Sequence, residues 1–154
     1  MLKGAGSAFR YRDKPRQLRV SVAPGDSAAG HIGLRVVFTN TASHRCTMYG
    51  YPGVSFLTSA HGRQINVPAE RSAAQGGPKL IPLAAGGKAH ADLLLVNTAN
   101  FATNTCKPQK AAGVRVYPPD ETASAFASYP VMVCSVNGVG AAQIYPVVSG
   151  AGGS

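Results

Sequence analysis

The sequence has 154 residues, of which 45% are hydrophobic and 14% are charged, and its formal net charge is +9. This length accommodates one substantial hydrophobic core but leaves little room for a second domain, and the hydrophobic content argues against a disordered chain. No apolar run approaches the roughly 20 residues that a membrane helix needs, because the best candidate covers only 91–96.

Hydrophobic periodicity predicts short strands along most of the chain. At 18–22 apolar and polar residues alternate, as they do when successive side chains point to opposite faces of a strand. The same alternation predicts a long strand at 88–96, which follows the segment 79–83 and a glycine-containing turn. Further strands are expected at 32–39, 46–49, 54–58, 64–67, 113–117, 131–136 and 143–148.

Glycine, proline and small polar residues predict the connections between these strands. The polar stretch 69–78 is expected to be a loop, and 122–129 is compatible with a single helical turn. Many short strands without intervening helices predict an all-β fold, an immunoglobulin-like antiparallel β-sandwich. The sequence contains no Trp, so the cysteine and tryptophan pattern of antibody domains is missing.

Three regions are expected along the chain: a basic and flexible amino-terminal arm at 1–17, a β-sandwich domain at 18–148 and a flexible tail at 149–154. The start lacks the apolar segment of a signal peptide, and we expect that any signal peptide or lipid anchor lies outside this sequence. Six basic residues crowd the beginning of the chain, namely Lys3, Arg10, Arg12, Lys14, Arg16 and Arg19.

The sequence has three cysteines, which allow three single bridges with one thiol left over. A bridge between Cys106 and Cys134 is preferred, because both residues lie near ends of predicted strands in the second half of the chain. Such a bridge favours an oxidising compartment. Three buried thiols in a cytosolic protein and an intermolecular bridge through Cys46 are the alternatives.

Several segments together resemble one family, the actinobacterial domain of unknown function 4232. The most specific is the run Cys-Thr-x-x-Gly-Tyr-Pro-Gly-Val at 46–54, and Gly30-His31, Thr39-Asn40-Thr41, 82–89 and 116–119 add weaker matches. The resemblance implies an exported or lipid-anchored all-β domain of the cell envelope without assigned catalytic residues. The family usually has a cysteine before the first strand, where this chain has the segment 13–17, which leaves the number of disulfides open.

No catalytic, cofactor or metal site is expected. The chain has no Gly-x-Ser-x-Gly motif and no paired acids placed for glycoside hydrolysis. It also lacks the Cys-x-x-Cys and His-x-x-x-His spacings of metal sites, and surface positions explain its four histidines, which are His31, His44, His61 and His90.

Tyr49, Tyr51 and Tyr117 are the candidate binding residues, because tyrosine offers a large amphipathic contact area at low entropic cost. Structural roles at the edge of the sandwich are the alternative for these side chains. The sequence thus favours a secreted or cell-envelope binding or structural module, monomeric or weakly oligomeric, whose partner is an unknown protein or envelope polymer. A polyanion or nucleic-acid binder acting through the basic arm, and a divergent hydrolase or metal-dependent enzyme, are the alternative hypotheses.

Overall fold

The structure is a computed structural model that describes residues 17–152. Strands dominate this part of the chain, and no helix in it is long and apolar enough to cross a membrane. The strands are β1 (Leu18–Pro24), β2 (His31–Asn40), β3 (Cys46–Met48), β4 (Gly53–Leu57), β5 (Gln64–Ile65), β6 (Glu70–Arg71), β7 (Ile81–Leu83), β8 (Lys88–Val96), β9 (Pro108–Tyr117), β10 (Ala125–Cys134), β11 (Gln143–Ile144) and β12 (Val148–Ser149). The short helical elements are η2 (Thr98–Asn100) and α1 (Thr103–Cys106).

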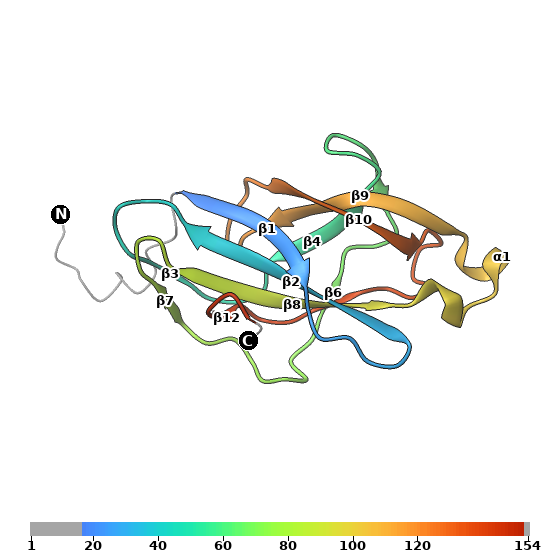
Figure 1. Cartoon of the computed structure of the whole chain (residues 1–154), viewed down its shortest axis with the longest axis horizontal. Helices are drawn as coiled ribbons and strands as arrows, with labels where there is room; N and C mark the ends of the chain where they lie inside the picture. Colours follow the sequence, from blue (N-terminus) through green and yellow to red (C-terminus); the bar gives the residue numbers. More distant parts are fainter. Residues whose placement is uncertain (1–16, 153–154) are drawn as a thin grey trace.

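These strands form three sheets (Figure 1). The largest has the order β1-β2-β8-β11-β6, and β12 pairs with β8 as well. The second has the order β10-β9-β4-β5, and β3 pairs with β7 in the third. The named strands pair antiparallel except for β6 and β11, which pair parallel. The predicted all-β, antiparallel class is therefore confirmed.

Side chains from all three sheets meet in one hydrophobic core. Alternate residues of β8 and β2 enter it, as the alternation in the sequence predicts, because successive side chains of a strand point to opposite faces. The second sheet contributes Val54 and Phe56 of β4 and Ala111, Val114 and Val116 of β9. The least exposed members are Val36, Phe38, Ala89, Ala91, Leu93, Ala111, Val116, Ile144 and Val147.

Residues 122–129, whose sequence is compatible with a single helical turn, form no helix in the structure. β10 begins at Ala125 and ends at Cys134, so the expected strand at 131–136 corresponds to the second half of a longer element, which ends two residues earlier than expected. Pairing with β9 imposes this conformation, with Ala125 opposite Val116, and a register shift between Ser128 and Val131 accommodates the irregular middle of β10. Because that pairing is decided by a neighbouring strand, local propensity does not reveal it.

Other boundaries also differ from the expected ones, and β9 begins at Pro108 although the expected strand covers only 113–117. The loop expected at 69–78 contains β6, which exists through its parallel pairing with β11. The closing strand expected at 143–148 is divided into β11 and β12, with Pro146, which has no N–H group to donate, between them. Beyond β12, the Gly150 amide donates to the Lys88 carbonyl at 2.9 Å, so hydrogen bonding to β8 continues past 148.

Asn40 closes the end of β2 and is fully buried. Its Nδ2 donates to the main-chain oxygens of His44, Leu83 and Ala84 at 2.9, 3.2 and 3.2 Å. Its Oδ1 accepts a hydrogen bond from the Ala42 amide at 3.0 Å. One buried side chain thereby joins the loop after β2 to the end of β7.

We expect Asn40→Asp to destabilise the fold, because a carboxylate replaces an amide group that donates to three carbonyl oxygens. Burial and these oxygens raise the pKa of the introduced carboxyl above its unfolded value, so the substitution is tolerated best below the unfolded pKa of about 3.9 and costs more stability as the pH rises. Urea unfolding at neutral pH is expected to show a loss of roughly 3–5 kcal/mol that shrinks toward pH 4. Asn137→Asp, at an exposed position, is the control, and equal losses in both variants would contradict this role.

Candidate functional site

The candidate tyrosines lie around the connection between β3 and β4. Tyr49 and Tyr51 belong to that connection, and Tyr117 is the last residue of β9. Gly53, the first residue of β4, pairs directly with Tyr117. Gly53 therefore lies between two of the tyrosines, two residues along the chain from Tyr51 and directly across the β4–β9 pair from Tyr117.

This connection is held firmly against its surroundings. Its residue Gly50 has a φ of 114°, in the region that favours glycine, and the Gly50 carbonyl accepts a hydrogen bond of 3.0 Å from the Val147 amide. Pro52 is buried, whereas Gly53 on its carboxyl side is exposed. The connection thus presents its tyrosines from an anchored backbone.

Two arginines that the sequence analysis did not single out accompany Tyr51 and Tyr117. The Cζ atom of Arg71 lies 5.4 Å from the centroid of the Tyr51 ring, and that of Arg115 lies 5.7 Å from the centroid of the Tyr117 ring. These distances are typical of cation–π contacts. Arg115 also donates from Nη2 to the Oε1 atom of Gln64 at 2.9 Å, which fixes the guanidinium above the second sheet.

The sequence contains a signal for one arginine but not for the other. Arg115 lies two residues before Tyr117 in an alternating strand, so strand periodicity places both on one face. Arg71 reaches Tyr51 only because the chain turns from β5 to β6 along the edge of β4, where the Ala69 amide donates to the Val54 carbonyl at 2.9 Å. The course of the chain from β5 to β6 depends on tertiary contacts, so the sequence alone does not indicate the contact between Arg71 and Tyr51.

Tyr49 differs from the other two candidates. Its side chain is 46% exposed, and it follows the pair of Met48 and Ile81 at the end of the β3–β7 sheet. Leu80, which immediately precedes the other strand of that sheet, β7, is 41% exposed. Tyr51 precedes Gly53 by two residues and Tyr117 lies opposite Gly53, whereas Tyr49 lies at the end of the β3–β7 sheet, where Leu80 is also exposed.

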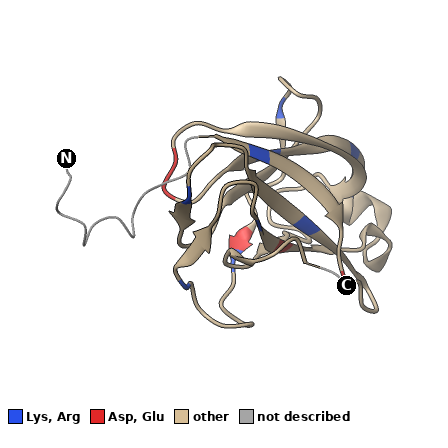
Figure 2. Ribbon diagram, turned by 60° about the vertical axis from the view of Figure 1, so that its left-hand side comes forward, with Lys and Arg blue, Asp and Glu red and all other residues tan. Residues whose placement is uncertain are grey.

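The basic arm expected at 1–17 lies almost wholly outside the described residues. Of the six basic residues at the beginning of the chain only Arg19 is described, in β1. In the described part, Figure 2 shows Lys and Arg on several separate elements.

Among the histidines, His31, His44 and His61 are exposed, and only His90 is buried. Its Nδ1 donates to the Gly150 carbonyl oxygen at 2.8 Å, and its Nε2 lies 3.7 Å from the Asp92 carboxylate. Both ring nitrogens therefore face a protein group. Residues 17–152 contain no group of three or more His, Cys, Asp or Glu side chains that could hold a metal ion.

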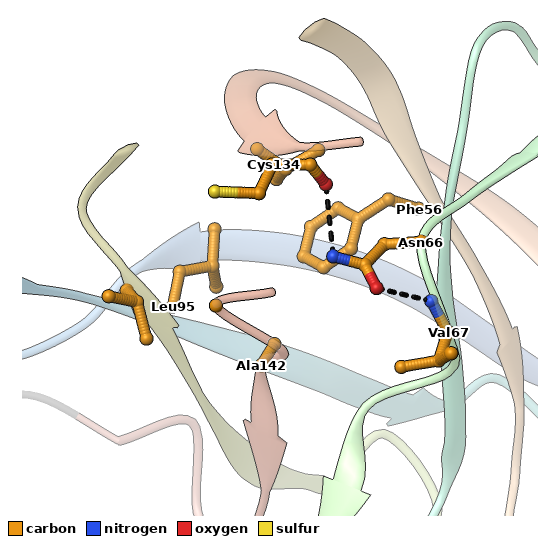
Figure 3. A pocket seen from close by; sticks show the side chains of 9 residues that line it. Phe56, Asn66, Val67, Leu95, Cys134 and Ala142 are labelled. Atoms are coloured by element: carbon orange, nitrogen blue, oxygen red, sulfur yellow. Dashed lines mark hydrogen bonds between the residues drawn. The ribbon is translucent and has the colours of Figure 1, made fainter. Parts of the chain in front are cut away.

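A pocket beside the disulfide offers little polar chemistry. Figure 3 shows Asn66 among mostly apolar neighbours, including Phe56, Leu95 and Ala142. Asn66 has a φ of 65°. Its Nδ2 donates to the carbonyls of residues 134 and 139, and its Oδ1 accepts from the amides of residues 67 and 138, at 2.7–3.0 Å. Because the Asn66 amide is fully used within the chain, this pocket is a weaker candidate than the tyrosines.

Cys106 and Cys134 form a disulfide, which is the pairing preferred from the sequence. Cys106 ends α1 just before β9, and Cys134 ends β10, so the bridge closes the open end of the β9–β10 hairpin. Cys46, on β3, is buried and lies outside this bridge.

These features define a disulfide-closed, all-β domain whose candidate site is a set of tyrosine and arginine side chains at a sheet edge. The sequence matches the model of the family described as Domain of unknown function (DUF4232) over residues 14–148, and the chain belongs to this family. The match confirms the resemblance drawn from the cysteine and tyrosine segment at 46–54. Neither the curated proteins nor the solved structures include a match to the chain.

We expect Cys106→Ala combined with Cys134→Ala to lower the free energy of unfolding by about 3 to 4 kcal/mol, since the bridge restricts the unfolded chain. Urea unfolding of the oxidised protein and the double variant measures the difference. Reductant should destabilise the unsubstituted protein and leave the double variant unchanged. Equal stability of the oxidised protein and the double variant would show that the bridge adds nothing.

Proposed function

We propose that the chain is a non-catalytic binding or structural module of a secreted or cell-envelope protein. In this proposal its β-sheets form a rigid scaffold, and the tyrosines at the β3–β4 connection and the end of β9 contact a protein or an envelope polymer. The observation that carries it is the pair of tyrosine rings at Tyr51 and Tyr117, each under an arginine, on either side of Gly53. Aromatic and arginine side chains are enriched where proteins recognise partners.

The proposed scaffold is an immunoglobulin-like sandwich. Strand order supports it: β1, β2 and β8 are neighbours in one sheet, and β10, β9 and β4 are neighbours in the other. Their chain order and neighbours match strands A, B and E and strands G, F and C of that fold. The bridge between Cys106 and Cys134 differs from the usual one, which joins the two sheets.

The proposed location rests on the disulfide. Bridges persist in oxidising compartments and are rare where cellular reductants keep thiols reduced. A bridge at the end of a hairpin is therefore compatible with an exported domain, in agreement with the location that the family resemblance implies.

The proposed lack of catalysis is supported by the contacts of His90, the buried histidine, because both of its ring nitrogens face groups of the protein. A general base needs a ring nitrogen directed at the proton that it removes. In His90 the Gly150 carbonyl faces one nitrogen and the Asp92 carboxylate faces the other. Arg35, which lies 3.9 Å from the same carboxylate and 3.6 Å from Asp26, makes this group a structural ion cluster on β2 and β8.

The test is sedimentation with purified, insoluble bacterial cell walls. We expect the unsubstituted chain to bind and Tyr51→Ala combined with Tyr117→Ala to lose about tenfold in affinity or more, since aromatic side chains contribute strongly to recognition. Met132→Ala, which truncates an exposed apolar side chain on β10, is the control and should bind normally. Absence of binding by the unsubstituted chain, or equal binding by the tyrosine variant with its fold intact, would refute the proposal.

A further inference from the structure

Two guanidinium groups beside the candidate tyrosines have no carboxylate partner among the described residues. The ion pairs of this part of the chain centre on Asp92 and Arg35, and neither Arg71 nor Arg115 takes part in one. Each of these two cations instead lies near a tyrosine ring. A ring face attracts a cation but does not neutralise its charge, so both groups keep the capacity to bind an anion.

The two arginines retain hydrogen-bond donors to different extents. Arg71 is exposed, and its guanidinium makes no hydrogen bond within residues 17–152. Arg115 is half-buried: Nη2 donates to Gln64, and its Nε is buried without a partner in the described part of the chain. An anion beside Tyr51 would meet the guanidinium group of Arg71, and an anion beside Tyr117 would meet the remaining Nη1 group of Arg115.

Gly53 has no side chain, so its main chain is exposed at the position opposite Tyr117 and two residues after Tyr51. It is exposed, and a Cβ atom added to it would lie 3.5 Å from Tyr117 Cβ and 3.6 Å from Tyr117 Cδ2, which is ordinary van der Waals contact. Its φ is not among the positive values, so the backbone accepts other residues here. The position can therefore carry a test side chain without strain in the main chain.

We infer that the arginine–tyrosine face, defined as Tyr51, Gly53, Arg71, Arg115 and Tyr117, binds an acidic polysaccharide through its carboxylates. This inference rests on the proposed function and names the ligand class. Guanidinium groups recognise carboxylates through paired hydrogen bonds, and flat amphipathic rings suit the apolar faces of sugars. The net charge of +9 favours an anionic partner, and the oxidising compartment that the disulfide indicates favours an envelope polymer over nucleic acid.

The probe is oligogalacturonate, compared with neutral maltooligosaccharides and with oligothymidine, each titrated at low and high salt by calorimetry. We expect the acidic sugar to bind most tightly and to weaken with salt, because salt screens exposed charges. Gly53→Glu places a carboxylate between the tyrosines, and we expect it to weaken this binding at least about tenfold relative to the isosteric Gly53→Gln.

The arginines provide a second comparison. Arg71→Gln combined with Arg115→Gln should also lose about tenfold, whereas Arg63→Gln with Lys110→Gln, which removes the same charge from exposed positions elsewhere, should bind normally. Equal effects of Gly53→Glu and Gly53→Gln, equal affinity for neutral sugars, or tighter binding of oligothymidine would overturn the inference. The proposed function is tested separately by cell-wall binding of the tyrosine variants. If that binding depends on the tyrosines while these sugar titrations fail, only the inference about the ligand class is refuted.

Discussion

The antiparallel pairing of β2 with β8 is the constraint on which the remaining structure depends. It runs without interruption from His31 opposite Val96 to Thr39 opposite Lys88. Within it, the large ring of Phe38 lies opposite the small Ala89, and both are completely buried. Val36 likewise lies opposite Ala91, whereas Leu34 lies opposite Leu93, and these buried residues give the second sheet a surface to pack against. A one-residue slip would turn this whole set toward solvent, so the register is strongly specified.

Both edges of this central pair are occupied by elements that it positions. β1 covers the free edge of β2, and the kinked segment of β11 and β12 follows the free edge of β8. Between the last two strands the Tyr145 amide still donates to the Asp92 carbonyl at 2.9 Å, so Pro146 interrupts the ladder only locally. The Val147 amide then binds the Gly50 carbonyl at 3.0 Å, which connects the central sheet to the candidate site.

The sequence predicted those elements whose hydrophobic pattern is local, and it failed where pairing decides the conformation. The strand predicted at 88–96 begins and ends at those residues in the structure, because every second residue from Ala89 to Leu95 is apolar and buried. The first half of β10 has no clear strand pattern and its sequence is compatible with a helical turn, although pairing with β9 makes it a strand. The hydrogen bonds of Asn40 could not be predicted either. Asparagine at a strand end indicates a turn, but the sequence does not reveal that its side chain binds three carbonyl oxygens.

The candidate site depends both on residue types that are visible in the sequence and on strand pairing that is not. Tyr51 and Tyr117 stand out in the sequence by residue type, but their proximity follows from the register that pairs Gly53 with Tyr117. That register is set by the buried neighbours Val54 and Val116, which are opposite one another one residue further along and face the core. Packing inside the molecule therefore fixes Tyr117 opposite Gly53, two residues after Tyr51. The main chain that carries the candidate side chains is thus held in place by the packed core beneath it.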